Sequence, residues 1–266
     1  MLFGAPYTLV GDGSNLALRL HPDHLADLRD SGLTDETIRT AGVYSLRPRD
    51  IALFFNLRRG VPAEIETALC FPYQGGTFAR IKLFPALGRM KYAQPPGTPT
   101  RLYIPFTIND VVVYLCEGEK KTLAAHQAGL NAVGIGGVWS WLSNGQPIDD
   151  LNLIEWDGRE VTIIPDSDVW QRVDLLRPVY ALGRELRTQG ATMYVAQLPQ
   201  PGALKVGVDD FVVAGGKVGE LDVFSLGHRI FKSAAWWHGR WKLKKQWRHD
   251  GRILTITELA SGRDRA

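Results

Sequence analysis

The feature that most constrains this chain is the alternation of apolar runs and helical segments that begins after residue 109. Short apolar runs at residues 111–116, 132–135, 161–164 and 192–196 are predicted strands. Residues 120–128 and 175–188 are predicted helices, and a glycine follows each of them closely. Strands joined by helices of this length form right-handed βαβ units. The sequence therefore predicts an α/β fold whose parallel sheet is covered by helices on both faces.

The residues before this alternation predict a different kind of structure. Residues 21–43 form a predicted pair of short helices, which Gly32 separates and Thr34 restarts. Between residues 68 and 105, short strands are cut by Gly and Pro, and Lys91 and Tyr92 lie in a predicted loop. We therefore expect a smaller α+β N-terminal module over residues 1–108, the α/β domain over residues 109–218, and a basic, tryptophan-rich segment over residues 219–266.

Composition excludes some classes of protein. The formal net charge of +3 is too small to indicate a nucleic-acid partner by itself. The two cysteines, Cys70 and Cys116, offer neither a disulfide framework nor the ligands of a structural zinc site, which indicates a reducing cytoplasm. No signal peptide and no apolar run of membrane-spanning length is found, so we expect a cytoplasmic protein with no membrane partner.

Acidic residues follow three of the predicted strands. Glu117 comes directly after the first strand, Asp166 and Asp168 follow the third, and Asp209 and Asp210 come after the fourth. The carboxyl ends of parallel strands share one edge of a sheet, where ligands collect. Carboxylates grouped at that edge suit Mg²⁺ or Mn²⁺, which bind phosphate oxygens and activate a nucleophile.

Each acidic turn, taken singly, has an ordinary explanation. Aspartate is common at strand ends because it tightens turns and caps the next helix. Asp210 is equally well explained as the cap of a short helix that follows it. Only the combination of the three turns favours a metal site.

The motifs resemble those of a known domain. Glu117-Gly118-Glu119-Lys120-Lys121 after one apolar strand, and Asp166-Ser167-Asp168 after a later strand, resemble the TOPRIM signature of DnaG-type primases, topoisomerases and related nucleases. The resemblance extends to primase-like proteins of plasmids and phages, a family described as a domain of unknown function. The segments that carry it are His24 to Arg29, Ser31-Gly32-Leu33, Phe71-Pro72-Tyr73, Lys91-Tyr92, Pro95-Pro96-Gly97, Gly136 to Trp139 and Gly207 to Phe211.

The resemblance implies a TOPRIM-type, Rossmann-like sheet and a catalytic site. It implies that Glu117, Asp166 and Asp168 are catalytic metal ligands for Mg²⁺ or Mn²⁺, with Asp209 or Asp210 as a further acid. The implied activity is primase-like nucleotidyl transfer in the DNA replication of a mobile element. The implied partners are single-stranded DNA, nucleoside triphosphates and a separate replicative helicase.

Two departures from the better-known relatives leave alternatives open. The sequence has no cysteine and histidine cluster for a zinc module and no Gly-rich phosphate loop for a helicase motor. A TOPRIM nuclease would use the same acids with water as the nucleophile. A non-catalytic module that binds single-stranded DNA or a replication partner is the third interpretation.

Basic and aromatic residues near these motifs are candidates for binding nucleotides or nucleic acid. They are Lys120, Lys121, Arg80, Lys82, Lys91 and Trp139. Lysines could neutralise phosphate and an exposed tryptophan could stack on a base. Solvated lysines, an ordinary polar sheet face and buried tryptophans, Trp141 included, are the alternative interpretations of these residues. The glycines around Ile135 predict either a phosphate-binding turn or only a tight turn.

The segment from residue 229 to 252 is the most basic part of the chain. It holds eight Lys or Arg residues, among them Lys244 and Lys245, and a single acid, Asp250. Trp236, Trp237, Trp241 and Trp247 are interleaved with them. Cations alternating with indoles are typical of a single-strand-binding surface, and a tryptophan-rich packing element is the alternative.

Overall fold

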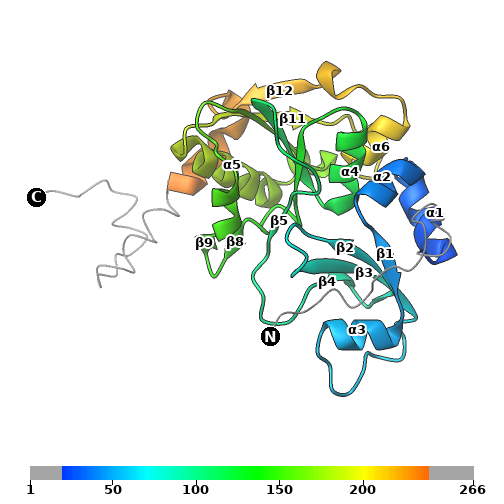
Figure 1. Cartoon of the computed structure of the whole chain (residues 1–266). Coiled ribbons are helices and arrows are strands. Elements are labelled where there is room, and N and C mark those ends of the chain that lie inside the picture. Colours follow the sequence, from blue (N-terminus) through cyan, green and yellow to red (C-terminus); the bar gives the residue numbers. More distant parts are fainter. Residues whose placement is uncertain (1–19, 240–266) are drawn as a thin grey trace, which may run out of the picture.

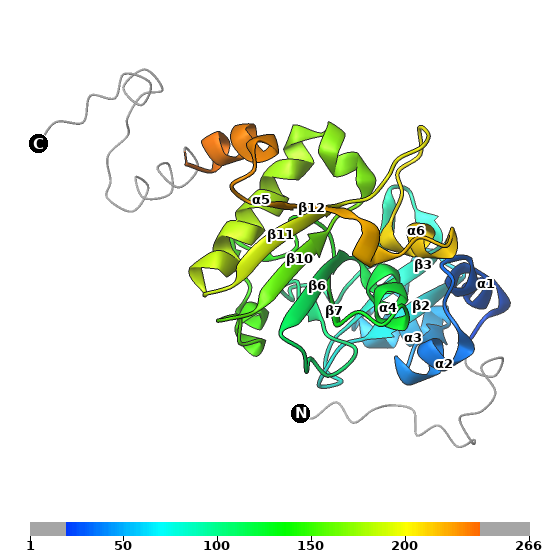
Figure 2. The same cartoon turned by 90° about the horizontal axis from the view of Figure 1, so that it is seen from above.

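A computed structural model of the chain describes residues 20–239, and its largest feature is a six-stranded sheet (Figure 1). Its strands are β5 Leu102–Tyr103, β6 Val112–Glu117, β7 Ala132–Ile135, β10 Glu160–Ile164, β11 Thr192–Gln197 and β12 Asp222–Ser225. Their order in the sheet is β12-β11-β10-β6-β7-β5 (Figure 2). The four inner strands run parallel, whereas the two edge strands are antiparallel to their neighbours. The predicted α/β fold with a mostly parallel sheet is confirmed.

Helices cover both faces of this sheet. They are α4 Glu119–Gln127, α5 Val173–Thr188 and α6 Val208–Val213. Val179 of α5 packs in one core cluster with Val113 and Val161. Ala125 of α4 lies in another cluster, together with Cys116. Successive strand residues point to opposite faces, so a strand that is apolar at every position can be buried between two helical layers.

The N-terminal module contains a helical hairpin and a four-stranded antiparallel sheet. Its elements are α1 Pro22–Asp30, α2 Asp35–Thr40, β1 Tyr44–Leu46, α3 Pro48–Phe54, β2 Thr67–Pro72, β3 Ala79–Leu87 and β4 Met90–Ala93. The sheet order is β1-β2-β3-β4. The Thr34 side chain accepts a hydrogen bond from the Thr37 backbone at the start of α2, as the sequence predicts. The smaller α+β N-terminal module is confirmed in its architecture.

Three parts of the fold differ from the sequence-based prediction. Lys91 and Tyr92 lie in β4 and not in a loop, and Lys82 pairs with Tyr92 across the two strands. Strand β5 joins the central sheet, where Leu102 pairs with Ile135 of β7. Strand β12 lies in a segment where the sequence pattern weakens. Short strands are poorly predicted because two to four residues carry too little periodicity to identify a partner.

The remaining elements are short. They are β8 Leu142–Ser143, β9 Gln146–Pro147 and the 3₁₀ helices η2 Asp149–Leu153, η3 Ser167–Gln171, η4 Val218–Glu220 and η5 Arg229–Phe231. Residues 232–239 are helical up to the end of the described range. Lys244, Lys245, Trp241 and Trp247 lie outside the described residues, so their predicted role in binding nucleic acid stays a prediction.

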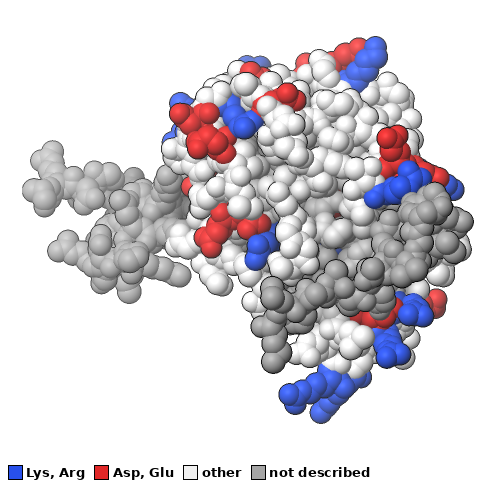
Figure 3. Space-filling view, in the orientation of Figure 1, with Lys and Arg blue, Asp and Glu red and all other residues white. Residues whose placement is uncertain are grey.

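Acidic and basic side chains are mixed on the molecular surface. On the face shown in Figure 3, most of the surface carries no charge, and Lys and Arg lie beside Asp and Glu in several small groups. The whole chain has nearly equal numbers of basic and acidic residues, 31 and 28, which gives the small net charge of +3. A strongly charged path for a polyanion would therefore have to be local. Within residues 20–239, no helix has the length and apolar character needed to cross a membrane.

Candidate active site

The ends of β6 and β10 place the first two acids of the motif at one edge of the sheet. Cys116 pairs with Ile164 in parallel register, Glu117 is the last residue of β6, and Asp166 follows two residues after Ile164. The chain then turns sharply at Gly118, whose φ of 101° lies in the region that favours glycine, and enters α4. The first turn of α4 therefore presents its lysines to the same edge.

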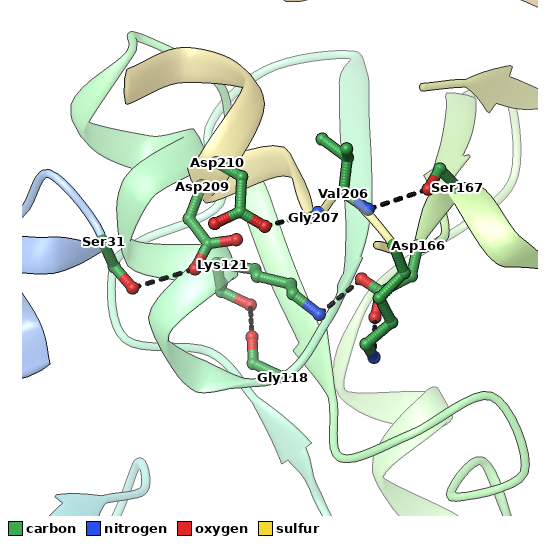
Figure 4. Close-up of polar contacts among 11 residues, drawn as sticks. Ser31, Gly118, Lys121, Asp166, Ser167, Val206, Gly207, Asp209 and Asp210 are labelled. Atoms are coloured by element: carbon green, nitrogen blue, oxygen red, sulfur yellow. Dashed lines mark hydrogen bonds and ion pairs between the residues drawn. The ribbon is translucent and has the colours of Figure 1, made fainter. Parts of the chain in front are cut away.

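Asp166 is the most enclosed of these acids. Only 2% of the surface of Asp166 is exposed. Lys121 Nζ donates to one carboxylate oxygen (Figure 4). Lys205 Nζ donates to the other at 2.5 Å. Both oxygens of this carboxylate thus carry an ammonium partner.

The loop that carries Lys205 is held in place by the residue after Asp166. The Val206 backbone donates to Ser167 Oγ at 2.8 Å, and the Ser167 backbone donates to the Val206 carbonyl at 3.0 Å. These two bonds fix the segment before α6 against the end of β10. Lys205 itself keeps 59% of its side chain exposed.

Glu117 and Asp168 extend the acidic group. Burial raises the pKa of Glu117, and the negative charges of Asp166 and Asp168 raise it further, against the opposing effect of Lys121 and Lys205. The Asp168 side chain is 24% exposed and lies 3.6 Å from an Arg172 guanidinium nitrogen. The carboxylates are therefore close enough to repel one another, which favours an added cation.

Asp209 and Asp210 have different roles although they are adjacent. Asp210 is the third residue of α6 and accepts a hydrogen bond from the Gly207 backbone at 2.8 Å, so it stabilises the start of the helix that contains it and not, as the capping interpretation expects, a helix that follows it. Asp209 is 6% exposed and accepts a hydrogen bond from Ser31 Oγ at 2.9 Å (Figure 4). Its other oxygen, Oδ1, has no hydrogen-bond partner among the described residues. Asp209 is therefore the member of this pair that could contact a ligand.

A pocket of about 180 Å³ lies between the N-terminal sheet and the strand ends. Its lining residues come from both regions of the chain and are mostly charged. They are Arg80, Tyr92, Glu117, Gly118, Glu119, Lys120, Lys121, Gly136, Lys205 and Asp209. A pocket with carboxylates on one wall and ammonium groups on another can hold a phosphate together with its counter-ion.

Arg80 forms one wall of this pocket. Its guanidinium donates to Glu119 Oε1 at 2.8 Å, and the Tyr73 hydroxyl donates to the same oxygen at 2.7 Å. A Cβ on Gly136 would lie 2.4 Å from Arg80 Nη1, so this glycine makes room for the guanidinium. Arg80 also stacks over the Tyr92 ring, with 5.1 Å from its Cζ to the ring centroid. It is thus held from three sides.

The other predicted binding residues lie in varied surroundings. Lys82 and Lys120 both donate to Asp27 Oδ1, at 2.6 and 3.2 Å. Lys91 of β4 is exposed to solvent. Trp139 is 44% exposed and touches the Trp237 ring edge to face. Trp141 is 2% exposed, as its packing interpretation expects.

Sequence reasoning missed Lys205, Glu119 and Ser31. Lys205 lies in a loop between Pro201 and Gly207, where no periodicity predicts the direction of its side chain. Glu119 is 1% exposed, although the first turn of a helix normally leaves glutamate in solvent. The position of Glu119, two residues after Glu117, was a signal in the sequence that it could belong to the site. Its partner Arg80 could not be inferred without the fold.

The acidic group fits a divalent cation in its chemistry, but not while the lysines hold Asp166. Among residues 20–239, no three acidic, histidine or cysteine side chains are arranged to hold a metal ion. The repulsion around Glu117 and the unpartnered Asp209 Oδ1 are both features that a cation would relieve. Both oxygens of Asp166 are hydrogen-bonded to lysines at the position where the sequence predicts a ligand of Mg²⁺ or Mn²⁺.

Solved structures of similar fold are primases. The zinc-binding and RNA polymerase domains of Aquifex aeolicus primase match 77% of this chain with a TM-score of 0.57 and 14% identity. A DnaG primase catalytic domain bound to single-stranded DNA matches 80% of this chain and 77% of its own, with a TM-score of 0.54 and 16% identity. The RNA polymerase domain of Mycobacterium tuberculosis DnaG, in complex with a double-stranded DNA oligomer with an overhang, matches 82% of this chain and 76% of its own, also at 0.54 and 16%.

These likenesses define a class of fold, that of the DnaG-type primase catalytic core. The match spans 57% of the Aquifex chain. In sequence, residues 106–218 match the family described as a domain of unknown function, DUF3854. No curated protein matches the chain.

Proposed function

We propose that this chain is a primase-like nucleotidyltransferase that uses Mg²⁺ or Mn²⁺ to join nucleoside triphosphates on a single-stranded DNA template. The observation that carries the proposal is the position of Glu117 and Asp166 at the carboxyl ends of adjacent parallel strands, beside a lysine-lined pocket. The fold of a primase catalytic core supports the same assignment. The catalytic group would be Glu117, Asp166 and Asp168, with Asp209 as a further acid.

A divalent cation held by these carboxylates would stabilise charge on the reacting phosphate and activate the attacking hydroxyl. The protein's own part is to bind and orient. Lys121 and Lys205 reach the same pocket and would bind phosphate oxygens. Glu119 holds Arg80 and thereby fixes the wall of the pocket that the N-terminal module contributes.

The proposed domain division follows the site. A TOPRIM domain over residues 109–218 would carry the catalytic acids, and the N-terminal module over residues 1–108 would contribute Arg80 and Tyr92. The basic segment over residues 219–266 would bind the template. The mobile-element setting and a separate replicative helicase are part of the same proposal and rest on the resemblance of the sequence motifs.

The test is a reaction of the full chain with single-stranded DNA, all nucleoside triphosphates and Mg²⁺ or Mn²⁺, with products resolved by size. New products that require the metal and disappear in Glu117→Gln and Asp168→Asn are the expected result. Shortened DNA would instead identify a nuclease that uses the same acids. Intact DNA binding without any product, across metals and templates, would overturn the enzyme and leave a binding module.

A further inference from the structure

The contacts of Asp166 differ from those of an open metal ligand. Its side chain is 3% exposed, and each of its two oxygens accepts a hydrogen bond from a different lysine. Two ammonium groups carry together the charge of one divalent cation. They therefore supply, at Asp166, the positive charge that a divalent cation would otherwise bring to this group of acids.

The two lysines are unequal in how firmly they are held. Lys121 projects from the first turn of α4, and its side chain is 20% exposed. Lys205 comes from the loop before α6, and its side chain is 59% exposed. A long side chain on an exposed loop can leave its partner at low cost, because water screens the pair. Lys205 is the lysine that would leave first.

A second observation is that the two lysines leave a neighbouring acid without a partner on one oxygen. Asp209 Oδ1 is buried without a hydrogen-bond partner among the described residues, and Asp209 lines the pocket that Lys121 also lines. A Cβ on Gly207 would lie 2.5 Å from both Asp209 Oδ1 and Lys121 Cε. The free oxygen and the lysine stem therefore lie on the same side of this loop. An oxygen desolvated in this way gains from a cation that reaches it.

We infer that Lys121 and Lys205 are internal counter-ions of Asp166, which a divalent cation displaces, and that the freed ammonium groups then bind phosphate of the substrate. The inference rests on the proposed function, since it concerns the metal and phosphate of that site. It explains how one pocket can have acids that suit a metal and still hold them in ion pairs. Phosphate affinity from these lysines should consequently appear only when the metal is bound.

The first experiment measures Mn²⁺ binding to the full chain by the electron paramagnetic resonance signal of free Mn²⁺. Lys121→Met removes a competitor for Asp166 and should tighten Mn²⁺ binding about tenfold, the amount expected for losing one charge-assisted hydrogen bond. Lys205→Met should act in the same direction with a smaller factor. Asp166→Asn should abolish the gain in combination with either change.

The matched control is Lys120→Met. Lys120 lines the same pocket, but it pairs with Asp27 and not with Asp166, so it reports only the general effect of removing a positive charge. If Lys121→Met and Lys205→Met bind Mn²⁺ no more tightly than Lys120→Met, the inference is wrong. Lys205 lies on an exposed loop, so its variant keeps the test valid even if Lys121→Met does not fold.

The second experiment measures the affinity for ATP and for a single-stranded oligonucleotide, each in Mn²⁺ and in EDTA. Lys121→Met should weaken binding several-fold in Mn²⁺ and leave it within about twofold in EDTA, because the metal-free lysine is engaged by Asp166. The ligand that shows this difference identifies the phosphate that the lysines bind. An equal loss in both conditions would contradict the inference.

These results are independent of catalysis. A gain in Mn²⁺ affinity without any nucleotide product would support the counter-ion role and count against the proposed enzyme. If the wild-type chain forms products but the lysine variants bind Mn²⁺ no more tightly than the control, the proposed enzyme is supported and the counter-ion role is wrong.

Discussion

Two aspartates in this molecule each bind two lysines, yet their surroundings differ. Asp27 of α1 binds Lys82 and Lys120 through one oxygen, and both lysine side chains are less than 20% exposed. Asp166 binds its lysines through separate oxygens, and Lys205 is largely exposed. The Asp27 group connects α1, β3 and α4, whereas the Asp166 group lies at the strand ends beside the pocket.

The balance of charge in the two groups is opposite. Burial lowers the pKa of Lys82, and the nearby ammonium of Lys120 lowers it further, against the effect of its hydrogen bond to Asp27. Burial also lowers the pKa of Lys205, but its hydrogen bond to Asp166 and the charges of Asp166, Glu117 and Asp168 raise this pKa overall. A second ammonium thus lowers the pKa of the lysine beside Asp27, whereas three carboxylates raise the pKa of the lysine beside Asp166. The first group joins the two modules, and the second is the one to which we assign cation binding in the proposed function.

The largest effect should come from Asp166→Asn. The proposed reaction depends on this carboxylate, so product formation should fall on the order of 100- to 1000-fold. Comparing the activity of the variant with that of the wild type requires that the variant folds. Circular dichroism of Asp166→Asn tests this. A variant that keeps wild-type activity in the primer-synthesis reaction would remove Asp166 from the site.

Acid should affect the N-terminal module through His24, which lies on the same helix as Asp27. His24 is 0% exposed and its ring contacts Ser45 Oγ at 2.7 Å and Thr67 Oγ1 at 2.9 Å. Burial, and next the neighbouring His21, lower the pKa of His24 to about 4 from an ordinary value of 6.5. The folded state therefore resists a proton that the unfolded state accepts below pH 6.5. The contribution to stability is complete above pH 6.5 and is lost as the pH falls to 4, a loss of about 3 kcal/mol.

Denaturant unfolding between pH 7.5 and pH 4 measures this loss. In His24→Gln the slope of unfolding free energy against pH should be smaller in that window, whatever the variant's absolute stability. Equal slopes in the two proteins would show that other groups produce the acid sensitivity.

Asp27→Asn should lower the unfolding free energy by about 2 kcal/mol, because it leaves two partly buried ammonium groups without their anion. Chemical denaturation at neutral pH measures the effect. Mn²⁺ affinity at the strand ends should change little in the same protein. A large loss of Mn²⁺ affinity with unchanged stability would reverse the roles assigned to the two aspartates.

The smallest effect is expected for Lys205→Met. Its ion pair is mostly exposed on the lysine side, so the unfolding free energy should change by less than about 0.5 kcal/mol. Denaturation under the conditions used for Asp27→Asn gives a direct comparison. A change as large as that of Asp27→Asn would mean that the loop before α6 depends on this ion pair for its structure.

The central sheet could be predicted from the sequence because its strands are apolar over whole runs, as in β6 and β10. The positions of Glu117 and Asp166 followed from the rule that parallel strands end at a common edge. The partners of these acids could not be predicted. Lys205 reaches Asp166 from a loop without periodicity, and Arg80 meets Glu119 only because the N-terminal sheet packs against α4. Such contacts depend on how separate parts of the chain pack together. The pattern of apolar and polar residues within one segment does not specify that packing.

The two antiparallel edge strands have a consequence for where the α/β unit can be cut. Strand β5 covers the outer edge of β7, and β12 covers the outer edge of β11. A fragment limited to residues 109–218 would lack both, and the backbone N–H and C=O groups of β7 and β11 would be open to pairing with another chain. The residues that bear the site are therefore fewer than those needed to keep its sheet from self-association, and a monomeric fragment has to begin before residue 102 and end after residue 225.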